Sequence, residues 1–183
     1  MNHEVWKSFA ANEVSHSMAH YLTTIQDLRE SRGYARVSDV AKDLDVTKGS
    51  VSVQIKHLKE KGFVTEDQNR FLTLTSLGES VAQEVTYSRG VLIQFIKDVL
   101  GIRPELAEVE ACKMEHLLSH ETSSKLLGFV QLLQSDDPDA TKLLRRFKTF
   151  QFSCPTLEEC KSCVEQCLIE FEPCRHDGGD QRR

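Results

Sequence analysis

Apolar and polar residues alternate along the first half of the chain with the spacing of short helices. Residues 16–31 carry apolar side chains three and four positions apart, which predicts a first helix that ends near Gly33. Residues 36–64 predict a short helix, a tight turn and a second helix, with Ser38 and Thr47 as their N-cap residues. The predicted inward faces consist of Met18, Tyr21, Leu22, Ile25, Leu28, Val40, Ala41, Leu44, Val51, Ile55 and Leu58.

A β-hairpin is predicted directly after the second helix of this pair. Two β-prone runs, residues 63–65 and 71–74, flank the polar turn 66–70. Two short helices joined by a turn also occur in proteins that never contact DNA, but a hairpin at this place is typical of a wing. We therefore predict a mainly helical fold in which residues 10–75 form a winged helix-turn-helix domain with a β-hairpin wing.

The second helix of this pair is locally basic, although the 183-residue chain has a net charge of −5. Residues 47–61 contain four lysines and one acidic residue. Short side chains at the start of such a helix let it enter the major groove of DNA, and Arg70 on the wing would contact the DNA backbone. The candidate DNA-binding residues are Ser38, Thr47, Lys48, Ser50, Ser52, Gln54 and Arg70.

The following segment predicts helices with more leucines than a small core needs. Residues 77–102 predict a long helix interrupted near Gly90, Pro104 begins another helix that continues through His116, and residues 124–133 predict a third. Proteins with a helix-turn-helix use two copies to reach major-groove faces about 34 Å apart. We therefore predict that residues 76–135 form a helical metal-binding and dimerisation domain.

Cys112, Glu115 and His116 lie three and four positions apart on the helix predicted from Pro104. Residues at this spacing share one helix face, so sulfur, oxygen and nitrogen donors can converge on one metal ion. The same spacing also fits a buried cysteine beside a solvated helix edge. Spacing alone leaves both interpretations open.

Residues 14–134 resemble the diphtheria toxin repressor family of iron-dependent regulators and its manganese-sensing branch. The similarity is carried by "HYLTTIQDL", "YARVSDVAKDLDVTKGSVSVQIKHLKEKGFV", "LTLTSLGES" and, most specifically, "EACKMEHLLS". It implies that Cys112, Glu115 and His116 bind the activating metal, with a further ligand from the first helix, where this chain has His20. It also implies that a homodimer binds operator DNA.

Departures from the family pattern point to one core metal and to its type. His20 stands where iron sensors have methionine and manganese sensors aspartate, and Thr23 replaces a glutamate of manganese sensors. Two imidazoles, one thiolate and one carboxylate suit Fe(II), with Co(II), Zn(II) or Ni(II) as surrogates, better than Mn(II). The family's ancillary site corresponds to Arg89, Ile93 and Glu108, so we expect Arg89 to pair with Glu108 and a single metal site to remain.

Residues 136–183 form a cysteine-rich tail that lies beyond the resemblance, and residues 135–140 are expected to form an acidic linker. Five of the six cysteines lie in the tail, with the spacing C-x5-C-x2-C-x3-C-x6-C. This spacing predicts an iron-sulfur cluster, with structural zinc, thiol-disulfide switching or free thiols as alternatives. The candidate ligands are Cys154, Cys160, Cys163, Cys167 and Cys174.

The sequence as a whole predicts a regulator rather than an enzyme. It has no apolar run near the roughly 20 residues that cross a bilayer and no signal-peptide pattern, so we expect a cytoplasmic protein without membrane contact. The sequence shows neither a nucleophile placed with a general base nor a phosphate-binding loop that would indicate catalysis. We predict a metal-dependent, iron-responsive transcriptional repressor; the alternative is a winged-helix regulator gated by redox or iron-sulfur status through the tail.

Overall fold

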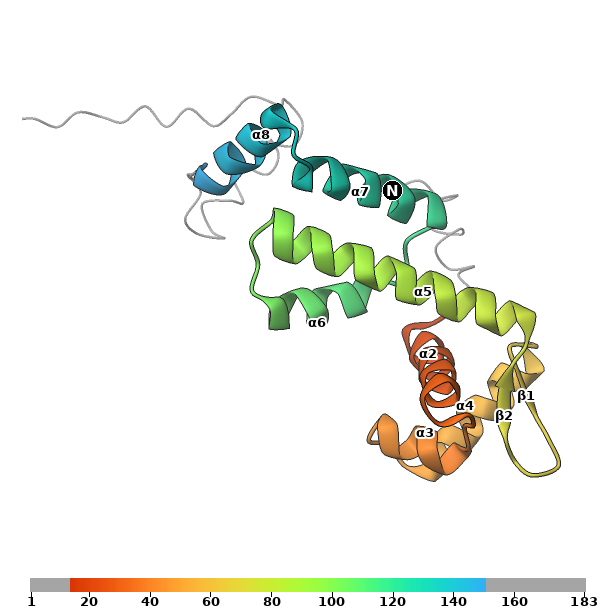
Figure 1. The fold of residues 1–183 in the computed structure, drawn as a ribbon. Helices are drawn as coiled ribbons and strands as arrows, with labels where there is room; N and C mark the ends of the chain where they lie inside the picture. Colours follow the sequence, from red (N-terminus) through yellow and green to blue (C-terminus); the bar gives the residue numbers. More distant parts are fainter. Residues whose placement is uncertain (1–13, 151–183) are drawn as a thin grey trace, which may run out of the picture. The chain divides into compact units, whose positions relative to one another are not determined.

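A computed structural model describes residues 14–150 as a series of helices with one small hairpin (Figure 1). The first elements are α2 (His16–Arg32), α3 (Val37–Asp43), α4 (Lys48–Glu60), β1 (Val64–Glu66) and β2 (Leu72–Leu74). They are followed by α5 (Ser76–Gln94), the π-helical turn η1 (Phe95–Val99), α6 (Pro104–Met114), α7 (His120–Gln134) and α8 (Pro138–Thr149). The predicted fold class, mainly helical with a β-hairpin wing, is confirmed.

The helix-turn-helix forms largely where the sequence predicts it, because its capping signals are local. Gly33 ends α2 in the left-handed conformation at φ 81°, which favours glycine. The Thr47 hydroxyl accepts the backbone N–H of Ser50 at 3.2 Å and caps α4. Ser38 is not a cap: α3 begins one residue before it, and the backbone N–H of Arg36 donates to the Asp39 carboxylate at 3.1 Å instead.

We call residues 16–74 the winged-helix part, and its core is closed. The two strands pair antiparallel, with Val64 opposite Leu74 and Glu66 opposite Leu72. Gly78, in the first turn of α5, fits directly against the wing, because a Cβ atom there would lie 2.1 Å from the Phe63 carbonyl oxygen. The fully buried core residues of this part include Leu22, Ile25, Val40, Val51, Leu58 and Leu72.

We call residues 76–134 the helical part, in which α5 packs between α6 and α7 (Figure 1). The interruption expected near Gly90 is wrong: α5 continues through this residue, and the helix changes to the wider π form only at Phe95. The end of α6 also differs, since the helix stops at Met114 and leaves Glu115 and His116 in the turn that follows. A small apolar cluster of Leu92, Ile96, Ala107 and Ala111 joins η1, α5 and α6.

The expected acidic linker is shorter than its sequence indicates. Pro138 begins α8, so residues 138–140 are helical rather than extended. Proline suits the first turn of a helix, and the backbone N–H groups of Asp139 and Ala140 donate to the Asp137 carboxylate.

No helix of residues 14–150 is both long and apolar enough to span a bilayer.

Candidate metal centre and DNA interface

His20 and Cys112 come together although 92 positions separate them. His20 lies on α2 of the winged-helix part, Cys112 lies on α6 of the helical part, and His20 Nε2 is 3.2 Å from Cys112 Sγ. Both side chains are partly buried. The donor atoms of two differently placed helices therefore meet at one point, and His20 is the residue that the family resemblance suggested as the ligand from the first helix.

His16 is a member of this cluster that the sequence analysis missed. Its Nε2 lies 4.0 Å from Cys112 Sγ, and its ring centroid lies 4.5 Å from that of His20. One potential ligand atom from each of His16, His20, Cys112 and Glu115 lies within 4.8 Å of all the others. The sequence does carry a signal, because histidines four positions apart share a helix face.

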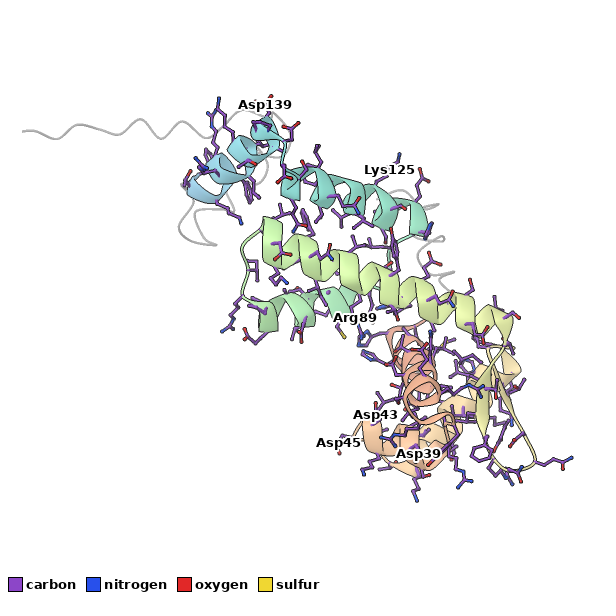
Figure 2. The ribbon with its side chains drawn as sticks, in the orientation of Figure 1. Asp39, Asp43, Asp45, Arg89, Lys125 and Asp139 are labelled. Carbon is purple, nitrogen blue, oxygen red and sulfur yellow. The ribbon has the colours of Figure 1, made fainter. Side chains whose placement is uncertain are left out.

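Glu115 is fully buried and paired with Arg89 of α5. Figure 2 labels Arg89 at its place on the ribbon. Arg89 Nη2 donates to Glu115 Oε1 at 2.9 Å, and Arg89 Nε donates to Glu115 Oε2. The hydrogen bonds that Arg89 donates to Glu115 raise the pKa of Arg89, against the opposing effect of its burial. The expected pairing of Arg89 with Glu108 is therefore wrong: Glu108 is exposed on α6, and Ile93 packs against the small apolar cluster.

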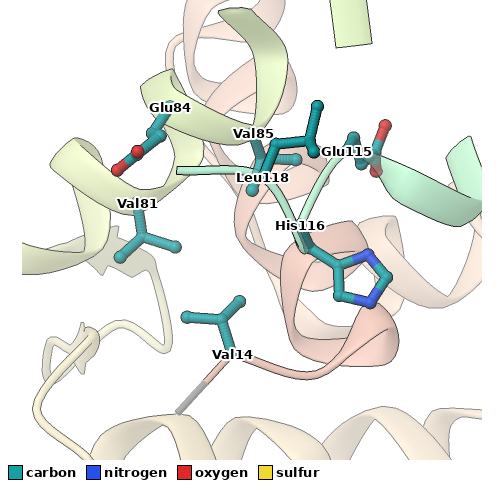
Figure 3. A pocket seen from close by; sticks show the side chains of 7 residues that line it. All are labelled: Val14, Val81, Glu84, Val85, Glu115, His116 and Leu118. Carbon is teal, nitrogen blue, oxygen red and sulfur yellow. The ribbon is translucent and has the colours of Figure 1, made fainter. Parts of the chain in front are cut away.

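His116 lies beside the cluster rather than inside its tightest group. Its ring centroid is 5.2 Å from that of His16, and Figure 3 shows its imidazole directed toward the start of α2. A pocket of about 170 Å³ reaches both Glu115 and His116. Burial and the neighbouring His16 lower the pKa values of His20 and His116, which keeps both imidazoles neutral and able to bind a metal at neutral pH.

The donor set fits a divalent transition-metal ion. Nitrogen and sulfur ligands bound to one tetrahedral ion at roughly 2.0 and 2.3 Å lie about 3.5 Å apart. The distances from Cys112 Sγ, 3.2 Å to His20 Nε2 and 4.0 Å to His16 Nε2, fall on either side of this value. Small side-chain adjustments would therefore bring these donors to one ion.

Two family models match the chain in succession. The N-terminal DNA-binding domain of iron-dependent repressors matches residues 13–71, and their metal-binding and dimerisation domain matches residues 75–144. The chain belongs to the iron-dependent repressor family. It is a metal-dependent transcriptional repressor that binds operator DNA and dimerises, and it is not an enzyme.

Relatives of this repressor include HTH-type transcriptional regulators named MntR. The regulator MntR of Lysinibacillus sphaericus is 32% identical over 133 residues, which are 73% of this chain and 94% of that protein. MntR of Bacillus subtilis is 32% identical over 121 residues, which are 66% of this chain and 84% of that protein. The alignment with MntR of Lysinibacillus sphaericus thus extends over nearly the whole length of that relative.

Solved structures share the fold of this repressor. That of T. acidophilum IdeR is 25% identical, with a TM-score of 0.53, over 63% of this chain and 54% of its own length. A manganese-dependent transcriptional repressor in complex with manganese is 26% identical, with a TM-score of 0.53, over 61% of this chain and 52% of its own. The repressor spans about half the length of these two solved chains.

The predicted DNA-contacting residues of the repressor are only partly gathered at one place. A hollow of about 530 Å³ lies between α3, α4 and the wing, and Ser38, Lys48, Ser52 and Arg70 line it. Its lining also includes four charged residues that were not among the candidate DNA contacts, namely Arg36, Lys56, Lys59 and Glu66. Basic side chains on both sides make this hollow a candidate site for the phosphate backbone.

The other predicted DNA contacts are placed differently in the repressor. The Thr47 and Ser50 hydroxyls lie 3.0 Å apart at the start of α4, where both remain exposed, and Gln54 is partly buried. The Arg36 guanidinium lies 4.5 Å from the centroid of the Phe71 ring and thereby joins the start of α3 to the wing. Five cysteines predicted as cluster ligands lie outside the described residues, namely Cys154, Cys160, Cys163, Cys167 and Cys174.

Proposed function

We propose that this repressor senses Fe(II), with Co(II), Zn(II) and Ni(II) as surrogates, rather than Mn(II). The meeting of His20 with Cys112 is the observation that carries the proposal, because thiolate and imidazole donors favour these ions over manganese. The Thr23 hydroxyl lies 3.2 Å from the carbonyl oxygens of Ala19 and His20, so it stays with its own helix. The proposal differs from what the names of the manganese-dependent relatives say of those proteins.

Metal binding and DNA binding are coupled through the two residues from different parts of the chain. A bound divalent ion would supply a bond between His20 of the winged-helix part and Cys112 of the helical part. Glu115 and His116 are the further ligands that the family resemblance implies. Because His20 and Cys112 hold α2 against α6, they favour the arrangement that binds DNA, and DNA tightens metal binding by the same factor.

The helical part offers a surface for the second copy of the chain. An apolar groove of about 450 Å³ runs along η1, α6 and α7. Leu100, Leu106 and Met114 border it and are more than a third exposed. We propose that this groove is covered in the homodimer. We also propose that the start of α4 in each copy enters one major groove, with the hollow of α3, α4 and the wing at the flanking phosphates.

DNA binding with and without metal tests the proposed function. An operator fragment selected in vitro with Fe(II)-loaded protein should bind the loaded repressor about 5- to 150-fold more tightly than the apo form at fixed salt. Cys112→Ser should lose most of this difference and His120→Ala should keep it. Equal operator affinity of the apo and Fe(II)-loaded protein would contradict the proposal, and a larger effect of Mn(II) than of Co(II) would contradict its metal assignment.

We further propose that the cysteine-rich tail holds an iron-sulfur cluster. The C-x2-C-x3-C spacing of Cys160, Cys163 and Cys167 supports it, since it resembles part of the bacterial ferredoxin pattern. Anaerobic purification followed by iron and acid-labile sulfide analysis tests it, with the five-cysteine serine variant as the control. Zinc without sulfide would favour a structural zinc site instead.

Gating through the tail is the alternative function, and the cysteine spacing again favours it. In that case Cys160→Ser would abolish control of DNA binding by oxidants, whereas Cys112→Ser would leave this control intact. The core proposal expects Cys112→Ser to lose control of DNA binding by metal and Cys160→Ser to keep this control.

A further inference from the structure

We propose that His16 is a ligand of the core ion and that Arg89 withholds Glu115 from it. This inference rests on the proposed function and changes the ligand set that the family resemblance implies. The ion is held by His16, His20 and Cys112, with His116 as the fourth donor. Glu115 stays outside the ligand set as the partner of Arg89.

The position of His16 suits a ligand. It lies one turn before His20 on the same face of α2, and its Nε2 is 4.0 Å from Cys112 Sγ. Its ring contacts those of His20 and His116, at centroid distances of 4.5 and 5.2 Å. The Nε2 atoms of His16 and His20 therefore both face the Cys112 thiol, and the His116 ring lies beside that of His16.

The Arg89 guanidinium already occupies the carboxylate that the family pattern assigns to the metal. Both oxygens of Glu115 accept hydrogen bonds from Arg89, and the Glu115 side chain is fully buried. A guanidinium fork matches a carboxylate with two parallel hydrogen bonds, which is among the strongest neutral-pH pairings in proteins. A metal ion that took Glu115 as a ligand would have to displace this cation or lie against it.

The resulting set of nitrogen and sulfur donors has consequences for metal choice. Carboxylate oxygens suit Mn(II), whereas imidazole and thiolate ligands suit Zn(II), Co(II) and Fe(II). By holding Glu115 away, Arg89 removes the oxygen donor that would favour manganese. Replacing Arg89 with glutamine should release the carboxylate and move the preference of the site back toward Mn(II).

Co(II) binding to the full-length protein tests the inference. The five tail cysteines are replaced with serine so that thiolate-to-cobalt charge transfer reports on Cys112 alone. His16→Ala should lower Co(II) affinity by more than the 10- to 100-fold that outer-sphere changes cause, and His120→Ala should leave it unchanged. Glu115→Gln should keep the charge-transfer band and cost less than about tenfold, the lower end of that range.

Arg89→Gln gives a second reading that does not depend on losing a ligand. Its Mn(II) affinity, followed by the electron paramagnetic resonance of free Mn(II), should rise by about tenfold or more relative to Co(II). Circular dichroism of each apo variant shows whether it folds. Arg89→Lys, which keeps the charge but loses the fork, serves as the replacement if Arg89→Gln does not fold.

The outcomes separate this inference from the proposed function. Unchanged Co(II) affinity in His16→Ala, together with loss of binding in Glu115→Gln, would overturn the inference while leaving the metal-dependent repressor intact. The proposed core site itself would be overturned if Co(II) gave no charge-transfer band, or a band that Cys112→Ser did not remove. A band retained in Glu115→Gln and weakened in His16→Ala supports both.

Discussion

The winged-helix part and the helical part are built from similar helices but close their cores to different degrees. In the winged-helix part Leu22, Ile25 and Leu58 are buried to 3% exposure or less. In the helical part the apolar cluster of Leu92, Ile96, Ala107 and Ala111 is smaller, and Leu100, which is 40% exposed, lines the open apolar groove. The difference indicates that the first part is complete in one chain, whereas the second leaves apolar surface for a second copy to cover.

One helix belongs to both parts and joins them. The first turn of α5 packs against the wing at Gly78, and its later turns carry Arg89 and Ser88 into the helical part. The Ser88 hydroxyl lies 2.8 Å from that of Ser123 on α7, and both serines are fully buried. Within the helical part, buried polar pairs thus tie α5 to α7 and to the turn after α6, in addition to the small apolar cluster.

Matched leucine substitutions should give the largest effects and test this difference. Leu22→Ala should lower the free energy of unfolding by about 2–5 kcal/mol, because it leaves a closed cavity in the winged-helix part. Leu92→Ala should cost less, at or below the lower end of that range, because Leu92 lines the open groove. Urea unfolding of the apo proteins measures both losses, and equal losses would show that the two cores are closed alike.

The winged-helix part could be predicted from the sequence because its signals are local. Apolar spacing, the Thr47 cap and the glycine at position 33 each act within a few residues, and the structure places the corresponding helix ends there. The Ser38 cap failed because Asp39 offers its carboxylate to the backbone N–H of Arg36 and so starts α3 earlier. A serine close to a helix start competes with its acidic neighbour for this role.

The metal centre could be predicted only in part, since its contacts join distant segments. The sequence pattern and the family resemblance pointed to His20 and Cys112, and the structure brings these two side chains together. His16 was missed because it has no counterpart in the motifs that carried the resemblance. The pairing of Arg89 with Glu115 was missed because charge alone allowed Arg89 several acidic partners, and only the packing of α5 against α6 selects one.

Alanine substitutions at two glycines of α5 should change stability in opposite directions. The larger change, second in size to that of the leucine substitutions, is expected at the glycine that packs against the wing. Gly78→Ala should destabilise the protein by about 1–3 kcal/mol, because its Cβ would overlap the Phe63 carbonyl oxygen. Gly90→Ala should stabilise it by about 0.5–1 kcal/mol, because no atom lies within 4 Å of a Cβ there and alanine favours a helix. Thermal unfolding checks both, and a neutral Gly78→Ala would show that the wing can move away from α5.

A charge in the apolar groove should separate dimer stability from domain stability. Leu106→Asp should weaken dimerisation by about tenfold or more, equivalent to about 1.4 kcal/mol, because the carboxylate would have to lose its water at the interface. The winged-helix part should keep its unfolding midpoint, since Leu106 lies outside its core. Analytical ultracentrifugation measures the dimer, with Leu143→Asp on α8 as the exposed control. An unchanged dimer would place the second copy elsewhere.

The smallest change in stability is expected for Glu66→Gln on the wing, and its dependence on pH shows whether the Glu66 charge is responsible. The Glu66 carboxylate accepts hydrogen bonds from Lys59 Nζ at 2.8 Å and from Arg70 Nη1 at 3.3 Å. The hydrogen bond from Lys59 is the largest cause that lowers the pKa of Glu66, and the one from Arg70 adds to it. Burial acts in the opposite direction. Because the folded pKa lies below the unfolded one, the pair stabilises the fold above the ordinary glutamate pKa, and this contribution is lost as pH falls through the lowered value. Glu66→Gln should therefore cost less than about 1 kcal/mol at neutral pH, as expected for exposed partners, and nothing once wild-type Glu66 is protonated. Urea unfolding of the wild type and the variant across this pH range measures the difference, and a cost that persists in acid would mean that Glu66 stabilises the wing through packing rather than charge.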